Sequence, residues 1–260
     1  MALDSVTRSR AERMMTQTLC VLALLVSTLN AGADTVHIVT GTYPPFAFEQ
    51  DGQQKGLAVE IVREAFARMG DEVRIEFLPF ARAIAIFKAG QADAIFPFSI
   101  DADRLTYTLY PKEHLIADTP TLFVKKGSGI GFSGNLKDLA EYSFGMQRSA
   151  SSGSVFAEAV KSGVITKMED SLDQEQNIKK LMLNRIQVII GPRLVIRYEF
   201  QKLGLGKDIQ ELSPAVDKPL AAYLGFSKLR NRKDLLARFD KALHAMKVDK
   251  TYEKISLRYE

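Results

Sequence analysis

The feature that most constrains the fold is an alternation of short apolar runs with helical stretches along the chain after residue 34. Val36–Thr40, Val73–Phe77 and Ala94–Phe98 have the length and composition of strands. Between the first two, Leu57–Met69 carries apolar residues at helical spacing, and Gly70 follows it as a helix C-cap would. Strands separated by helices indicate βαβ units. We therefore predict an α/β fold with mostly parallel sheets.

The same pattern continues in a second block, so we expect two similar α/β halves and a long closing helix. The remaining strands are expected at 121–125, 142–147, 164–168, 187–190 and 220–227, and the remaining helices at 81–88, 135–141, 154–161, 175–183, 195–202 and 232–246.

The first 33 residues differ from the rest of the chain. Arg8, Arg10 and Arg13 precede an apolar run at 19–29, and an Ala-Gly-Ala segment ends at Ala33. This order predicts a secretory signal peptide at 1–33. The apolar run is shorter than the ~20 residues of a membrane span, and an uncleaved anchor is the alternative.

Cys20, the only cysteine, lies within this predicted leader. The mature chain would then have no cysteine, which excludes disulfide scaffolds, thiol catalysis and cysteine-based metal sites. The three histidines, His37, His114 and His244, lack metal-ligand spacing, so we interpret them as structural. We predict no metal and no cofactor.

The formal charge of +4 is spread over interleaved acids and bases, which is typical of a solvated surface, and we predict no nucleic-acid partner. The segment 129–134 satisfies G-x-G-x-x-G, but no long helix opens directly on it. We therefore do not expect a dinucleotide site.

Five motifs occur in a specific order and spacing: Gly41–Phe46, Gly56–Ile61, Ala89–Ile95, Ser99–Arg104 and Val248–Ile255. Together they resemble family 3 of the bacterial extracellular solute-binding proteins, the polar amino-acid type, over essentially the whole mature chain. The resemblance implies the two-lobed type II periplasmic-binding-protein fold, the Venus flytrap, with a mixed, mostly parallel sheet in each lobe.

The resemblance further implies that two crossing strands join the lobes and that a ligand is trapped between them by hinge closure. On this basis we expect lobe 1 at 34–124 plus 226–260 and lobe 2 at 125–225.

Arg104 matches the carboxylate-binding arginine that the resemblance implies, and a guanidinium fork suits a carboxylate. Ser99 would add a hydroxyl or backbone contact beside it. The alternative for Arg104 is a surface salt bridge with Asp101 or Asp103.

Tyr43 and Phe46 lie in a Pro-rich loop at the carboxyl end of a predicted strand, where open α/β sheets bind ligands. Either ring could stack on a solute, or both could pack into the core.

The segment Ser149–Gly153 is expected to open a helix, where free N–H groups favour an anion. Serine is also simply a good N-cap. In relatives a similar segment binds the same carboxylate, and Arg148 would add positive charge.

One position departs from the family pattern. The resemblance implies an Asp after the last strand of lobe 2 that holds the ligand's amine, and Pro192 stands there with Arg193 beside it. A more anionic ligand is therefore a hypothesis.

Arg82 faces either the cleft or solvent. The expected ligand-binding residues are Tyr43, Phe46, Arg82, Phe98, Ser99, Arg104, Arg148, Ser149, Ser151 and Arg193.

The function implied by the resemblance is that of a monomeric periplasmic binding protein, not an enzyme, which delivers an amino acid or related organic acid to the permease of an ABC-type importer. Two alternatives stay open: a cyclohexadienyl dehydratase-like enzyme on the same fold, which would need an acid in the cleft, and a sensory ligand-binding domain.

Overall fold

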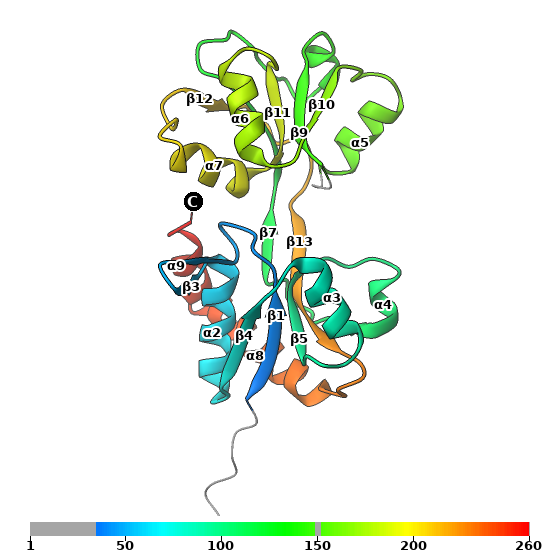
Figure 1. Ribbon diagram of the computed structural model, residues 1–260, viewed down its shortest axis with the longest axis vertical. Coiled ribbons are helices and arrows are strands. Elements are labelled where there is room, and N and C mark those ends of the chain that lie inside the picture. Colours follow the sequence, from blue (N-terminus) through cyan, green and yellow to red (C-terminus); the bar gives the residue numbers. More distant parts are fainter. Residues whose placement is uncertain (1–34, 149–151, 260) are drawn as a thin grey trace, which may run out of the picture. The chain divides into compact units, whose positions relative to one another are not determined.

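Two mixed β-sheets, each packed with helices, organise the chain (Figure 1). The computed structural model describes residues 35–148 and 152–259. The predicted leader and two of the predicted site residues, Ser149 and Ser151, lie outside these ranges. Residues 36–260 form one unit, and only this unit is described below.

The first sheet, which with its helices we call lobe 1, has the order β4-β1-β5-β13-β6, and β7 also pairs with β13. β4 and β5 run parallel to β1, whereas β13 runs antiparallel to β5, β6 and β7. The strands are β1 (Val36–Thr40), β4 (Val73–Phe77), β5 (Ala94–Phe98), β6 (Thr108–Leu109), β7 (Ile116–Asp118) and β13 (Leu220–Ser227).

The second sheet, with its helices lobe 2, has the order β10-β9-β11-β8-β12. Its first three strands are parallel to one another, and β8 is antiparallel to both of its neighbours. The strands are β8 (Pro120–Lys125), β9 (Phe144–Gln147), β10 (Met168–Ser171), β11 (Val188–Pro192) and β12 (Ile209–Glu211).

The connecting helices and a small hairpin complete the two lobes. Lobe 1 has the hairpin β2 (Phe48–Gln50)–β3 (Gln53–Lys55) and the helices α2 (Leu57–Met69), α3 (Phe80–Lys88), α4 (Arg104–Tyr107), α8 (Lys233–Val248) and α9 (Thr251–Ser256), while lobe 2 has the 3₁₀ turn η1 (Leu136–Leu139) and the helices α5 (Ser154–Lys161), α6 (Gln174–Met182) and α7 (Arg193–Lys202).

α2 illustrates how the sequence dictates these elements. Its apolar positions face one side and are fully buried, including Ile61, Ala65 and Phe66. The helix ends because Gly70 adopts the left-handed conformation, with φ 74°, and its N–H donates to the carbonyl of Ala67. This conformation suits glycine, which has no Cβ to clash. The predicted helix and its cap are confirmed.

The lobe 1 core joins segments that are far apart in sequence. The ring of Phe239 in α8 lies 5.7 Å from those of Phe66 in α2 and Phe226 in β13. All three are fully buried. The closing helix, which the apolar pattern at 232–246 predicted, is therefore a structural part of lobe 1.

β7 and β13 form the connection between the lobes (Figure 1). They pair antiparallel, with Asp118 opposite Leu220 and Ile116 opposite Ala222. We expected the crossings near 123–124 and 224–225. The structure differs because β8 pairs along its whole length within the lobe 2 sheet. We therefore propose the crossings at 116–118 and 220–222.

One predicted strand, 164–168, is wrong. Ile165 is fully buried in the lobe 2 core without belonging to a strand, and the strand that pairs with β9 is Met168–Ser171. An apolar run indicates that its residues are buried but not that they form a strand, and here the buried residues belong to a loop.

Candidate functional site

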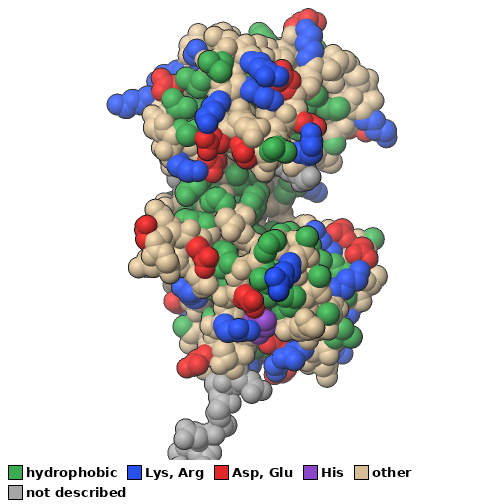
Figure 2. All heavy atoms as spheres, viewed as in Figure 1, with side chains coloured by type: hydrophobic (Ala, Val, Ile, Leu, Met, Phe, Trp, Pro, Cys, Tyr) green, Lys and Arg blue, Asp and Glu red, His purple; other side chains and the backbone are tan. Residues whose placement is uncertain are grey.

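A cavity of about 580 Å³ is lined by residues of both lobes and of the crossing strands. Binding sites of small ligands have this size and position, between two rigid bodies. In Figure 2, apolar side chains gather at the junction between the lobes, while charged side chains are scattered over both. The lining includes Thr42, Tyr43, Phe46, Phe80, Ser99 and Arg104 from lobe 1, Ile116, Asp118, Leu220 and Ala222 from the crossing strands, and Gln147, Arg148 and Pro192 from lobe 2.

The loop after β1 places an aromatic side chain on the cavity wall. Tyr43 is 37% exposed, and its ring lies 5.4 Å from that of Phe46, which is fully buried. The loop is held by two hydrogen bonds between Tyr43 and Ala47, in which each backbone N–H donates to the other residue's carbonyl, at 2.6 and 3.0 Å. Burial raises the pKa of the Tyr43 hydroxyl, and the nearby Asp118 carboxylate raises it further. Tyr43 thus offers a neutral aromatic surface, and Phe46 supports it from behind.

Arg104 borders the cavity in a fixed position. Its Nη1 donates to the hydroxyl of Ser99 at 2.5 Å and to the Ser99 carbonyl at 3.1 Å, and its Nε lies 3.0 Å from Asp101. The guanidinium stacks 4.1 Å from the ring centre of Phe98. The arginine therefore lines the cavity and also forms the expected salt bridge with Asp101, while carboxylate binding by it stays a prediction. A guanidinium held on three sides is ready to bind an anion at little entropic cost.

Lobe 2 contributes Gln147 and Arg148 at the carboxyl end of β9. The backbone of Arg148 is anchored because its N–H donates to the Ser171 carbonyl at 2.8 Å. Its side chain is 67% exposed, and its Nε is 3.9 Å from Asp170, a loose ion pair. Arg148 is therefore free to turn toward a ligand.

The helix that we expected at 154–161 begins at Ser154, and a carboxylate of the chain itself binds to its first turn. Asp217 accepts from the Ser154 hydroxyl at 2.9 Å and from the Val155 N–H at 3.1 Å. These hydrogen bonds lower the pKa of Asp217 to about 2. Because Asp217 already takes the Val155 N–H, this helix start differs from the open anion site that the sequence suggested.

Asp118 was missed by the sequence analysis. It ends β7 and borders the cavity. Its carboxylate accepts from the Thr119 N–H at 2.8 Å and from the Leu194 N–H at 3.1 and 3.2 Å. Burial raises the pKa of Asp118 to about 6, although these backbone donors act in the opposite direction. The three-residue strand that carries it is too short to leave a periodic signal, so no pattern marked this acid.

Three expected site residues do not line the cavity. Phe98 is fully buried and supports Arg104 from below. Arg82 is exposed on α3. The Nε of Arg193 donates to Glu211 at 2.8 Å, which holds this arginine at the start of α7. The neighbouring Pro192 borders the cavity.

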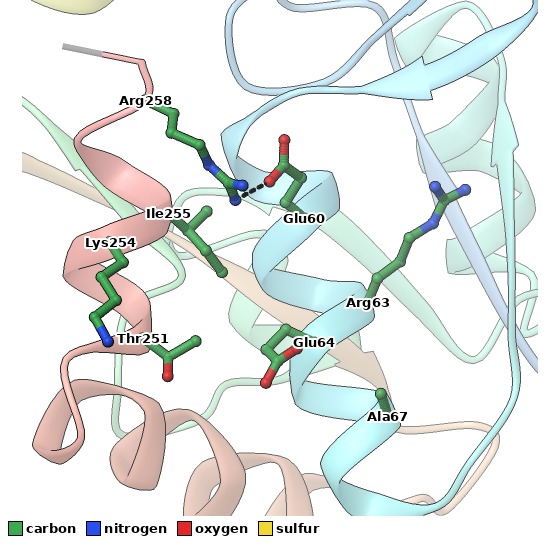
Figure 3. A pocket seen from close by; sticks show the side chains of 8 residues that line it. All are labelled: Glu60, Arg63, Glu64, Ala67, Thr251, Lys254, Ile255 and Arg258. Carbon is green, nitrogen blue, oxygen red and sulfur yellow. Dashed lines mark hydrogen bonds and ion pairs between the residues drawn. The ribbon is translucent and has the colours of Figure 1, made fainter.

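A second concavity of about 540 Å³ lies on lobe 1 between α2 and α9 (Figure 3). Glu60 and Arg258 point toward one another across it and form an ion pair, and the Tyr259 hydroxyl also donates to Glu60. These contacts attach the C-terminal segment to α2. Over residues 35–148 and 152–259 no cluster of His, Asp or Glu could hold a metal, and no helix there has the length and apolar character needed to span a bilayer.

Two α/β lobes joined by two paired strands, with a largely apolar cavity that also carries a few charged groups between them, define a type II periplasmic binding protein. Residues 36–260 match the model of the bacterial extracellular solute-binding proteins, family 3, and the chain belongs to this family. The expected fold class is therefore confirmed.

Individual relatives are distant but extend over nearly the full length. The chain is 23% identical to "Probable amino-acid-binding protein YxeM" of Bacillus subtilis strain 168, across 95% of this chain and 96% of that protein. It also resembles substrate binding domain 2 of Lactococcus lactis GlnP in its open conformation, with a TM-score of 0.70 and 20% identity, across 88% of this chain and 97% of that one. A substrate binding protein of a polar amino acid ABC uptake transporter from Streptococcus thermophilus gives 0.67 and 20%, across 86% and 85%. At these identities the structural likenesses support the fold alone.

Proposed function

We propose that this protein is the periplasmic substrate-binding component of an ABC-type importer, and that it captures a small carboxylate-bearing solute between its lobes without chemical change. The observation that carries the proposal is Arg104, stacked on Phe98 and hydrogen-bonded to Ser99 at the wall of the cavity. Closure of the lobes would remove water from the guanidinium and a bound carboxylate, and their charge-assisted hydrogen bonds would become stronger.

The names of the relatives support an amino acid or a related organic acid as the solute. These names also support a membrane permease as the partner.

We further propose that residues 1–33 are a cleaved signal peptide and that the mature protein is a periplasmic monomer. Within the site, we propose that Tyr43 packs against the body of the solute.

A thermal-shift screen of the mature protein against amino acids, dicarboxylates and small peptides tests this function. A ligand at one hundred times its dissociation constant stabilises the folded form by about 2.7 kcal/mol. For a protein of this size that corresponds to an increase in Tm of roughly 5–11 °C. Arg104→Gln should abolish the shift, whereas Arg82→Gln, on an exposed helix face outside the cavity, should leave it unchanged.

Two results would contradict the proposal. The first is an unchanged affinity of the Arg104→Gln variant for a carboxylate that binds the wild type. The second is turnover: incubation with prephenate should leave its absorbance unchanged, and a steady change would instead support the dehydratase alternative.

A further inference from the structure

Asp118 is the only acidic residue among the described residues that line the cavity. It stands at the end of β7, on the connection between the lobes, opposite Leu220 of β13. The other charged side chains of the lining are the two arginines, Arg104 and Arg148. The cavity therefore presents positive charge from each lobe and a single negative charge from its centre.

The carboxylate of Asp118 has no cationic partner within the described part of the chain. All of its hydrogen bonds come from backbone N–H groups, those of Thr119 and Leu194 being 2.8–3.2 Å long. Taking a carboxylate out of water without a counter-ion is costly, and the raised pKa of about 6 reflects that cost. The backbone N–H donors stabilise the ionised form of the group and oppose that cost.

Apart from the N–H groups at the start of α7, the described surroundings of Asp118 supply no positively charged side chain that pairs with it. Pro120 pairs with Pro192 on the next strand, and both line the cavity beside it. Arg193, which follows, donates its backbone N–H to the Thr119 carbonyl, and its guanidinium is taken by Glu211. The backbone donors fix the Asp118 side chain in place, so no reorganisation is needed when a cation arrives.

We infer that Asp118 is the specificity-determining residue for an ammonium group of the solute. This inference rests on the proposed function. Arg104 and Arg148 would bind the acid end of the ligand, and Asp118 would accept hydrogen bonds from its –NH₃⁺. The solute is then a zwitterion, not the more anionic ligand that Pro192 suggested. A half-buried, pre-positioned carboxylate favours a ligand that brings its own counter-charge and rejects one that leaves it unpaired.

The test uses pairs of ligands that differ only in this group. For the amino acid that binds the wild type best, the dissociation constant is measured by calorimetry and compared with that of the analogue in which –OH replaces –NH₃⁺; if the amino acid has two amines, each is replaced in turn. The wild type should prefer the ammonium compound by at least about tenfold, the size of a charge-assisted hydrogen bond. Asp118→Asn should bind both compounds within about threefold of each other, with the hydroxyl analogue scarcely affected.

Asp71→Asn serves as the control, since Asp71 pairs with Arg238 away from the cavity, and it should keep the wild-type preference. The inference is overturned if the wild type binds both compounds equally, or if Asp118→Asn retains the preference. The proposed function itself fails in a different way, namely if the wild type binds neither series.

A measurement on the wild type covers the case in which Asp118→Asn does not fold. Carbon-13 NMR of the Asp118 carboxyl group gives its pKa with and without ligand. Binding of the amino acid should lower this pKa because an ammonium lies beside the carboxylate, and binding of the hydroxyl analogue should not. An unchanged pKa in the amino acid complex would overturn the inference.

Discussion

Asp93 holds together three segments of lobe 1, and its replacement by Asn should be among the most destabilising polar substitutions in this protein. Its side chain is 1% exposed. Oδ2 accepts the backbone N–H of His37 at 2.9 Å, and Oδ1 accepts the Nε of Arg230 at 3.0 Å and of Arg232 at 2.8 Å. The carboxylate thus links β1 to the segment between β13 and α8.

The expected loss of stability follows from the hydrogen bonds that the Asn side-chain amide cannot make. Asn has one acceptor oxygen, so either His37 or the arginines would face its NH₂ group, and the charge attraction disappears. Breaking a buried ion pair costs about 3–5 kcal/mol. Arg230 and Arg232 are partly exposed and can turn to water, which reduces the expected loss to about 2–3 kcal/mol. The corresponding fall in Tm is roughly 5–10 °C for a protein of this size.

Thermal unfolding followed by circular dichroism measures this effect, with Glu141→Gln as the control. Glu141 is 92% exposed and lies 3.5 Å from Lys167, so its loss should change stability by less than about 0.5 kcal/mol.

Burial alone would raise the pKa of Asp93, but hydrogen bonds from Arg230, His37 and Arg232 outweigh it and lower the pKa. The stabilisation is therefore present above the ordinary pKa of 3.8 and is lost as the pH falls through the lower folded value, so the wild type and Asp93→Asn should converge in acid. A Tm for Asp93→Asn within about 2 °C of the wild type at pH 7 would refute this account.

Three further predictions concern lobe 2 and the cavity. Gly145→Ala would place a methyl group 2.3 Å from Cδ1 of the buried Ile186, and this overpacking should cost about 1–3 kcal/mol in denaturant unfolding. The pKa of Asp118 is raised from 3.8 in the unfolded chain to about 6 in the folded protein, so the protonated group stabilises the fold fully below pH 4. This stabilisation is lost as the pH rises through 6. Urea titrations at several pH values should show the free energy of unfolding of the wild type falling by up to ~3 kcal/mol relative to that of Asp118→Asn. Phe46→Ala should lower stability by about 3–5 kcal/mol because the ring is fully buried, whereas Tyr43→Ala should chiefly weaken ligand binding in calorimetry.

Each of these predictions has a specific contradiction. Gly131→Ala, where a methyl group meets nothing within 4 Å, is the control for Gly145→Ala, and equal effects would exclude the steric explanation. A stability difference between wild type and Asp118→Asn that does not change from pH 4 to pH 6 would show that the folded carboxyl group titrates normally. Unchanged ligand affinity in Tyr43→Ala would remove this ring from the site.

The sequence predicted the elements whose pattern is strong and local. The strands Val36–Thr40, Val73–Phe77 and Ala94–Phe98 and the helices Leu57–Met69 and Ser154–Lys161 have the expected bounds, because period, caps and flanking turns agree there. The short strands Ile116–Asp118 and Ile209–Glu211 were not expected. A three-residue strand has no detectable period, and only its partner in space defines it.

The residues of the candidate site likewise divide into those that the sequence could indicate and those that it could not. The sequence indicated Tyr43 through its Pro-rich loop at the carboxyl end of a strand, and the family resemblance indicated Arg104; both border the cavity. It could not indicate Asp118, whose role depends on which backbone N–H groups of α7 lie beside it. Nor could it show that Glu211 binds Arg193, because that pair forms only when β12 returns to the sheet.

The division of lobe 1 between two stretches of the chain has a consequence for synthesis. All the strands and helices of lobe 2 come from one uninterrupted stretch, from Pro120 to Glu211, so this half can fold as soon as it is made. The buried face of α2 must wait for Phe239 in α8, close to the C-terminus. Until then Phe66 and its neighbours can pack only against the early strands of lobe 1, and the part of their surface that α8 covers stays exposed during most of translation. The half that appears first on the ribosome is therefore the last to become compact.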